Sequence, residues 1–150
     1  MKRLLTLSAL LLFSFNGWAE PIGIGCITQD AIDNGSDTYN WEFIIDSEKK
    51  NASVFHGKYD GLFPLVYEDY QNHISMILNE SIVYPQLKTR FRWVLDKDTL
   101  FAVIDYDSGN GVFERYFKGN FLCSQDNKVL LKAIDAIEKE KERKEKRIIK

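Results

Sequence analysis

The two cysteines of the chain, Cys26 and Cys123, are the residues whose chemistry the sequence defines most narrowly. Thiols form disulfides, bind metals or act as nucleophiles, and neither cysteine has a second cysteine or a histidine at a metal-binding or redox spacing. In an oxidising compartment two cysteines allow only one intrachain pairing. We therefore predict a Cys26–Cys123 disulfide. It closes a loop of 98 residues, counted inclusively, for which the chain-entropy model gives roughly 4 to 5 kcal/mol.

Two short segments combine carboxylates with tyrosines beside predicted turns. Tyrosine offers contact area at low entropic cost, and Asp and Glu pair with Lys and Arg, so this combination suits contact with a basic protein. The candidate partner-binding residues are Tyr67, Glu68, Asp69, Tyr70, Asp105, Tyr106 and Asp107. The plainer interpretation places Tyr67 and Tyr106 in the core and leaves the acids as solvated hairpin ends. In both cases we expect Asp105 and Asp107 to be exposed.

A basic ridge of opposite sign is formed by Lys88, Arg90 and Arg92, which alternate along one predicted strand. The simplest role for such a ridge is pairing with acids on a neighbouring strand. Cross-strand pairs with Asp105 or Glu114 are therefore expected.

The sequence contains no catalytic, cofactor or metal signature of useful specificity. The stretch from Asp105 onward resembles a calcium loop, but Gly109 stands at its fifth position and Glu114 falls two places short of the twelfth. His56 and His73, the only imidazoles, have no metal-binding companion. A hydrolase would require the fold to bring one of them beside a serine or a carboxylate. We expect no enzymatic activity, no cofactor and no metal.

Residues 1–19 have the pattern that is typical of a targeting segment. A basic start precedes residues 4–15, which are apolar at nine of twelve positions, and a small residue, Ala19, precedes Glu20. We predict a signal peptide over residues 1–19, cleaved between Ala19 and Glu20, and export to the periplasm or the cell exterior. An apolar run of twelve is short for a membrane anchor, which needs roughly 20 residues. Lipidation at Cys26 is disfavoured because that cysteine lies far beyond the apolar run.

Charge is distributed unevenly along the mature chain. Residues 20–127 hold 9 basic and 17 acidic side chains, a net charge of −8, whereas residues 128–150 hold 9 basic and 5 acidic ones, a net charge of +4. An acidic body repels phosphate backbones, so nucleic-acid binding is disfavoured, and it attracts positively charged partners.

Alternating apolar and polar residues between short turns indicate β-strands over most of the body. The predicted strands cover residues 41–45, 52–55, 62–67, 74–78, 89–95, 100–104 and 112–123. Short spacing and the lack of intervening helices favour antiparallel pairing of successive strands. We predict a mainly β domain over residues 20–125, a small antiparallel meander of seven or eight strands resembling a barrel.

A change of period after Cys123 predicts a C-terminal helix over residues 126–150. This helix carries an apolar stripe that consists of Val129, Leu130, Ala133, Ile134 and Ile137. Beyond residue 138 the helix is highly charged and expected to be solvated.

Together these features favour a secreted, non-catalytic protein-binding module of the inhibitor or toxin-neutralising kind, which uses an acidic surface to bind a basic protein. Two alternatives stay open. One is a small lipocalin-like carrier of an apolar ligand inside the barrel. The other is a membrane-surface protein that acts through its basic C-terminal helix.

Overall fold

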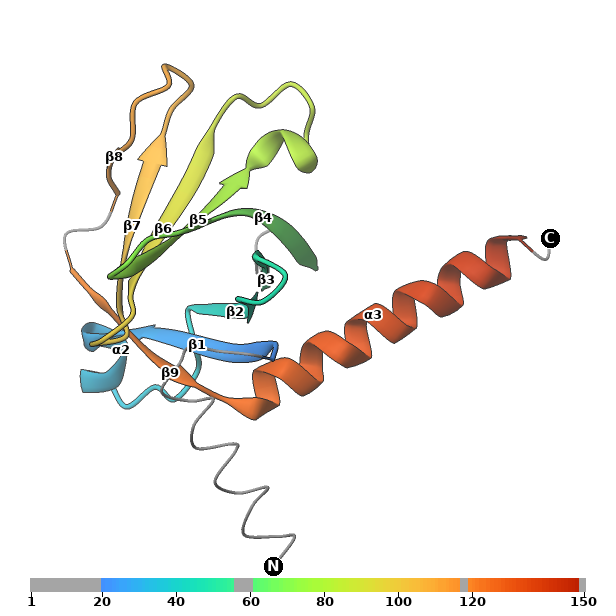
Figure 1. Ribbon diagram of the computed structural model, residues 1–150, viewed down its shortest axis with the longest axis horizontal. Coiled ribbons are helices and arrows are strands. Elements are labelled where there is room, and N and C mark those ends of the chain that lie inside the picture. Colours follow the sequence, from blue (N-terminus) through green and yellow to red (C-terminus); the bar gives the residue numbers. More distant parts are fainter. Residues whose placement is uncertain (1–19, 56–60, 117–118, 149–150) are drawn as a thin grey trace, which may run out of the picture.

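The computed structural model describes residues 20–55, 61–116 and 119–148, and the predicted leader 1–19, with Ala19, lies outside the described residues (Figure 1). The elements in chain order are β1 (Ile22–Thr28), α2 (Gln29–Asp33), β2 (Trp41–Asp46), β3 (Asn51–Phe55), β4 (Leu62–Asp69), β5 (His73–Asn79), η1 (Glu80–Ile82), β6 (Arg90–Asp96), β7 (Phe101–Asp107), β8 (Glu114–Arg115), β9 (Phe121–Gln125) and α3 (Asn127–Ile148).

Eight of these strands close into an antiparallel barrel. Each of β1 to β7 pairs with the next strand in sequence, β7 pairs with β9, and β9 returns to pair with β1. Hairpin connections between sequential neighbours make this a meander, which needs no crossover. β8 is an extra strand on β7, and α3 projects away from the barrel (Figure 1). The predicted mainly β meander with a C-terminal helix is confirmed.

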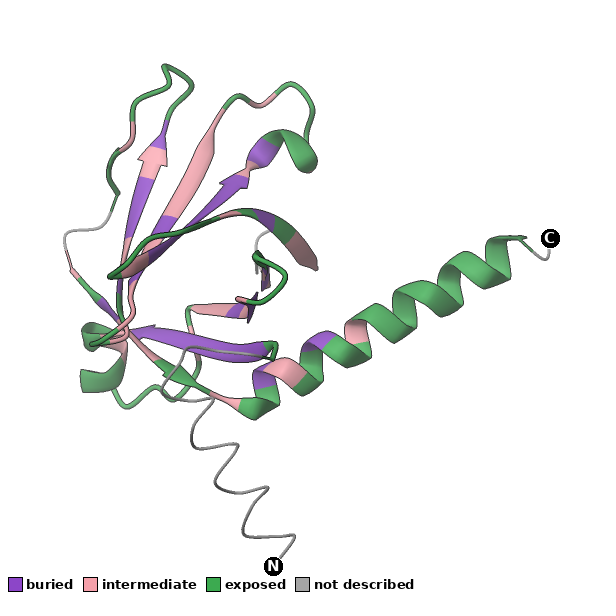
Figure 2. Cartoon of the chain, in the orientation of Figure 1, coloured by how far each residue is buried: buried purple, intermediate pink, exposed green. Residues whose placement is uncertain are grey.

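Side chains fill the interior of the barrel. Successive side chains of a strand point to opposite faces, so every second side chain points into the barrel. The buried positions lie along the strands of the barrel wall (Figure 2). Trp93 lies at the centre, with its ring centroid 5.0 Å from that of Trp41 and 5.4 Å from that of Phe43, both in edge-to-face geometry. Other fully buried side chains include Ile24, Ile45, Ile74, Met76, Leu78, Leu95 and Ile104. Large rings and branched side chains thus occupy the space that a lumen would need.

The strand predicted over residues 112–123 is wrong as a single element. β8 lies beside the end of β7, where Asp105 is opposite Arg115, and β9 lies beside the start of β7, where Ala102 is opposite Phe121. A continuous ladder from the first pair would place residue 118 opposite Ala102, so the chain carries three extra residues. This offset divides the strand in two.

The base of α3 packs tightly on β1. Asp126 caps the helix by accepting a hydrogen bond from the Lys128 amide at 2.9 Å. A Cβ atom at Gly23 would lie 2.5 Å from the Leu130 backbone nitrogen, so only glycine permits this approach. Val129 is buried in the contact.

The apolar stripe of α3 packs on the barrel only over its first turns. Val129 and Ala133 are buried, whereas Ile134 and Ile137 are exposed. The helix leaves the barrel surface after its first turns and is exposed along its distal half (Figure 2). Only the start of the stripe therefore packs on the β domain, because the barrel wall ends before the stripe does.

Cys26 and Cys123 face each other across β1 and β9, with their sulfur atoms 2.06 Å apart. The bond joins the first and last strands of the barrel at the point where the chain closes on itself. A disulfide is typical of an oxidising, non-cytoplasmic compartment.

Candidate functional site

Two of the three candidate tyrosines, Tyr67 and Tyr106, turn toward the inside of the barrel. Tyr67 packs against the core, and its burial, with Asp69 nearby, raises the pKa of its hydroxyl to about 12. Tyr106 shares the inward face of β7 with Ile104, and its ring centroid lies 4.9 Å from that of Phe91. Both tyrosines are half-buried, which leaves them little area for a partner.

The expectation that Asp105 and Asp107 are exposed is wrong, because they are only 4% and 1% exposed. The antiparallel register places Asp105 opposite Arg92 and Asp107 opposite Arg90. Each carboxylate accepts a bond of 2.8 Å from the Nη2 of its arginine, so the expected cross-strand pairing is confirmed. These acids serve the fold and are not available to a basic partner.

Phe113 explains the burial of this outer face. Its ring centroid lies 4.4 Å from the guanidinium carbon of Arg90 and 4.2 Å from that of Arg92. The loop after β7 thus covers the ion pairs from outside, and no strand periodicity could have indicated that cover.

Glu68 and Tyr70 lie on the outer surface and line a hollow that we call the outer groove. Its volume is about 440 Å³, and its walls also carry Arg90, Arg92 and Phe113. The Tyr70 hydroxyl donates a 2.7 Å hydrogen bond to Glu68 Oε2. The fold therefore brings Glu68 and Tyr70 near Arg90 and Arg92. These two arginines are the ones that pair with Asp107 and Asp105.

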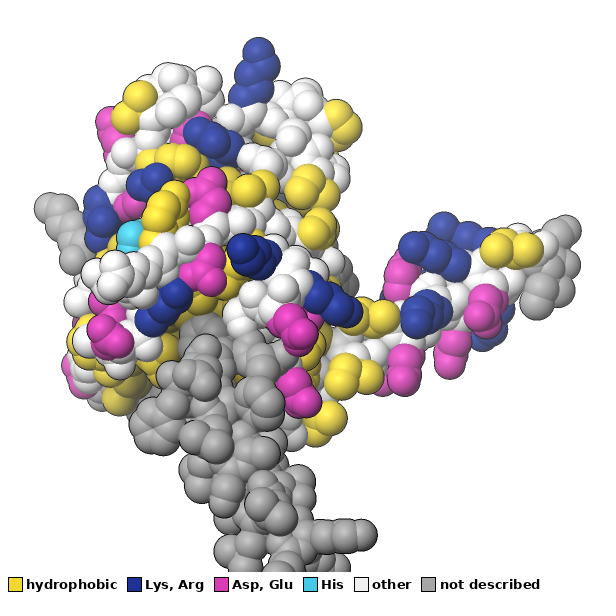
Figure 3. All heavy atoms as spheres, viewed as in Figure 1, with side chains coloured by type: hydrophobic (Ala, Val, Ile, Leu, Met, Phe, Trp, Pro, Cys, Tyr) yellow, Lys and Arg dark blue, Asp and Glu magenta, His cyan; other side chains and the backbone are white. Residues whose placement is uncertain are grey.

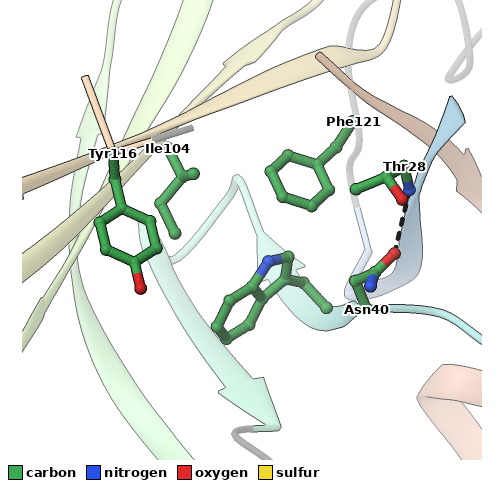
Figure 4. A pocket seen from close by; sticks show the side chains of 6 residues that line it. Thr28, Asn40, Ile104, Tyr116 and Phe121 are labelled. Atoms are coloured by element: carbon green, nitrogen blue, oxygen red, sulfur yellow. Dashed lines mark hydrogen bonds between the residues drawn. The ribbon is translucent and has the colours of Figure 1, made fainter. Parts of the chain in front are cut away.

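A second hollow, which we call the seam pocket, lies at the start of β9. It measures about 270 Å³ and is lined by Thr28, Asn40, Trp41, Ile104, Tyr116 and Phe121. Figure 4 shows the labelled side chains around one common space, with Tyr116 and Ile104 on one side and Phe121, Thr28 and Asn40 on the other. Ile104 and Phe121 are buried and Tyr116 is largely exposed, so the pocket leads from the core to the surface.

Both ends of one acidic segment meet at the seam pocket. Residues 29–39, which we call the acidic segment, leave the barrel after Thr28 and return before Asn40. The Thr28 amide donates a 2.9 Å hydrogen bond to Asn40 Oδ1, which pins the two ends together (Figure 4). Thr28 also caps α2 by accepting from the Ala31 amide at 3.2 Å.

The acidic segment carries three exposed carboxylates and no basic residue: Asp30, Asp33 and Asp37. Within the described parts of the chain none of these three forms an ion pair, in contrast to Asp105 and Asp107. The Tyr39 ring anchors the segment by packing where Gly25 leaves room on β1, and its hydroxyl donates 2.8 Å to Asp126. The uncompensated negative charge thus lies on an anchored loop beside an aromatic pocket.

Sequence reasoning missed the seam pocket because its aromatic residues, Trp41, Tyr116 and Phe121, are scattered and meet only through the divided last strand. The run of three acids without a basic residue between Thr28 and Asn40 was the readable signal.

Comparison of the chain with family models, curated proteins and solved structures finds no match. Across residues 20–55, 61–116 and 119–148, no three His, Cys, Asp or Glu side chains come together as a metal site. In the same residues no helix has both the length and the apolar composition of a membrane span. Of the two histidines, His73 lines the outer groove and His56 lies outside the described residues.

Proposed function

We propose that this protein is a secreted, non-catalytic binding module that docks a basic protein against the acidic segment and the seam pocket. The observation that carries the proposal is the coincidence of the two features: Thr28 and Asn40 line the pocket and also bracket a loop whose only charges are negative. Acidic and apolar groups together suit one kind of anchor, a long cationic side chain.

The pocket chemistry favours an arginine or a lysine of the partner. The aliphatic stem of such a side chain would contact Ile104 and Phe121, and its charged end would approach the rings of Trp41 and Tyr116 near the carboxylates of the acidic segment. A cation over an aromatic face contributes about 0.5 to 1 kcal/mol when exposed and roughly 2 kcal/mol when desolvated. Arginine is enriched among the residues that dominate protein interfaces.

The size of the pocket argues against the carrier alternative. Pockets that enclose drug-sized ligands measure roughly 300 to 1,000 Å³, and a benzene-sized guest fills a cavity of about 150 Å³. The seam pocket, at about 270 Å³, suits one side chain better than a lipid or a pigment. Trp93 and Phe43 occupy the barrel interior, where a carrier would hold its ligand.

The membrane-surface alternative rests on α3, where Ile134 and Ile137 are exposed near Lys141 and Lys144. Figure 3 shows Lys and Arg side chains interspersed with Asp and Glu side chains along this helix. Mixed signs weaken attraction to anionic lipids, so we rank this role below protein binding.

The predicted signal peptide and the Cys26–Cys123 disulfide both support export. The predicted leader is short, and we propose the periplasm or the cell exterior as the place where a basic partner is met.

Affinity capture from periplasmic and secreted proteins tests the proposal. The bait pair is the mature wild-type protein and a segment-neutral variant, in which Asp30, Asp33 and Asp37 are all changed to Asn. We expect a protein of high isoelectric point to be retained by the wild type at low salt and to be depleted on the variant. Retention of no basic protein, or equal retention by both baits, contradicts the proposal.

A matched control variant removes the same charge elsewhere. Glu48→Gln, Asp98→Asn and Glu138→Gln alter three exposed acids on the β2–β3 turn, the β6–β7 turn and α3. Capture by this control is expected to equal wild-type capture. A Tyr116→Ala bait, which removes one wall of the seam pocket, separates the pocket from the charge and is expected to bind more weakly.

A further inference from the structure

We propose that the outer groove is a second binding site, which takes a small aromatic carboxylate between the guanidinium groups of Arg90 and Arg92 and the Glu68–Tyr70 wall. The groove shares no lining residue with the seam pocket. The inference therefore stands independently of the proposed protein partner.

The two guanidinium groups are held in fixed positions. Arg90 donates from Nε (2.9 Å) and Nη2 (2.8 Å) to one oxygen of Asp107, and Arg92 donates from Nε (3.2 Å) and Nη2 (2.8 Å) to one oxygen of Asp105. The aspartate side chains are only 2% and 6% exposed. Buried partners of this kind remove the entropic cost of ordering long side chains when a ligand binds.

The same bonds leave one donor edge of each arginine for a ligand. They use Nε and Nη2, and within the described residues no acceptor is bonded to Nη1 of Arg90 or Arg92. Both arginine side chains keep about a third of their surface, at 31% and 33% exposed. A planar guanidinium edge binds a carboxylate or a phosphate through two parallel hydrogen bonds, and of these two anions the carboxylate is the planar one.

The buried carboxylates have no acceptor oxygen left for a further partner. Arg115 Nε forms an ion pair with the second oxygen of Asp105 at 2.7 Å. The second oxygen of Asp107 is occupied by the amides of Gly109 and Gly111. Both oxygens of each buried acid are thus occupied, so neither acid competes with a ligand for Nη1 of Arg90 or Arg92.

The other residues of the groove favour an apolar, aromatic ring as the part of the ligand that carries the carboxylate. Ile77 and Val94 provide apolar surface, and Phe113 presents an aromatic ring. Tyr70 and His73 stack at a centroid distance of 4.6 Å and add a second aromatic wall. Glu68 would repel a second negative group at the far end, so the ligand carries its charge at one end only.

The competing interpretation is that Phe113 and the arginines only shield the Asp105 and Asp107 ion pairs. In that case the groove is a by-product of packing and has no preference for an anion. The experiment must therefore compare ligands of one shape and different charge.

The test is NMR titration of the full mature protein with benzoate, benzamide and benzylammonium, a set of similar shape with negative, neutral and positive charge. We expect saturable shifts with benzoate at the amides of Ile77 and Val94 and at Nε–Hε of Arg90 and Arg92. Benzamide is expected to bind at least tenfold more weakly, and benzylammonium not to bind at these atoms. Equal shifts from benzoate and benzamide, or benzoate shifts that map elsewhere, overturn the proposal.

Two arginine variants separate the groove from the ion-pair network. Arg92→Lys keeps the charge but loses the planar fork, and we expect benzoate affinity to fall about tenfold. Arg115→Lys alters a partner of the same Asp105 but does not line the groove, so affinity is expected to stay within twofold of the wild type. Equal losses in the two variants would mean that the network, not the groove, controls the response.

Val94→Glu keeps the proposal testable if Arg92→Lys fails to fold. Val94 lies on the outer face of β6, where a glutamate would place a negative charge against the bound carboxylate. We expect benzoate shifts to disappear while the chemical-shift dispersion of the barrel remains. Unchanged benzoate binding in this folded variant overturns the proposal.

Discussion

Replacing Asp105 with asparagine tests whether the buried ion pairs of the outer face hold the barrel together. The Asp105 carboxylate accepts two charge-assisted hydrogen bonds from Arg92 and forms an ion pair with Arg115 at 2.7 Å. An asparagine carries no charge, so the ion pairs with Arg92 and Arg115 are both lost, and its NH2 group turns toward one of the two guanidinium groups.

The size of the effect follows from those losses and from the exposure of the arginines. Hydrogen bonds to charged groups contribute about 1.5 to 3 kcal/mol each, but Arg92 and Arg115 keep 33% and 51% of their side-chain surface and recover part of their hydration. We therefore expect Asp105→Asn to lower the free energy of unfolding by about 2 to 4 kcal/mol. In a domain of this size the melting temperature should fall by roughly 10 °C.

Urea and thermal unfolding followed by circular dichroism measure this change directly. Asp98→Asn is the matched control, because Asp98 is an exposed acid on the β6–β7 turn, and its effect should stay within about 0.5 kcal/mol. A change below about 0.5 kcal/mol for Asp105→Asn would show that the ion pairs of Asp105 with Arg92 and Arg115 contribute little to stability. It would also contradict the inference that Asp105 holds the Arg92 guanidinium in a fixed position.

Four further outcomes are expected. Reduction of the disulfide should lower stability substantially, because a 98-residue loop is released, and an unchanged melting temperature in reductant would contradict the bond. Gly23→Ala should detach α3 while leaving the barrel folded, since the new Cβ meets the helix backbone; amide exchange in the helix measures this, and unaltered protection would refute the close contact. Deletion of residues 140–150 should leave the fold and partner capture intact, because this part of α3 is exposed, and loss of capture would favour the membrane-surface role. The Gly109 amide and Arg90 hold the pKa of Asp107 below its usual range, so its contribution is present above about pH 5 and is lost as the pH falls through the depressed pKa. The acid limb of a stability–pH curve should therefore flatten in Asp107→Asn, and an identical limb would contradict this assignment.

The sequence could predict the strands that have one apolar face and one polar face. The hairpin of β6 and β7 is the clearest case, because alternation on both strands also implied that Arg92 could lie opposite Asp105. The burial of that aspartate could not be predicted, since it depends on Phe113, which comes from a loop without periodicity. The extent of α3 packing could not be predicted for a related reason: the stripe through Ile137 is a property of the helix, whereas its burial depends on where the barrel wall ends.

The seam pocket could not be predicted from the sequence, because it depends on the register of β8 and β9 against β7. It forms where three extra residues divide the last strand, and a periodic pattern does not reveal such an offset. The sequence shows that the neighbouring acidic segment has acidic residues and no basic residue, but it does not show where this segment lies. Only the fold shows that both ends of that segment, Thr28 and Asn40, line one pocket.

The central claim is most directly tested by the rate at which the captured basic protein associates with the wild type and with the segment-neutral variant as salt is raised. Screening shortens the Debye length from about 10 Å at 0.1 M salt to about 3 Å at 1 M, so long-range steering fades over this range. The account predicts a steep fall of the wild-type association rate, a slower and flatter curve for the segment-neutral variant, and wild-type behaviour for the control variant. Identical salt dependence for all three proteins would contradict the assignment of partner binding to the acidic segment.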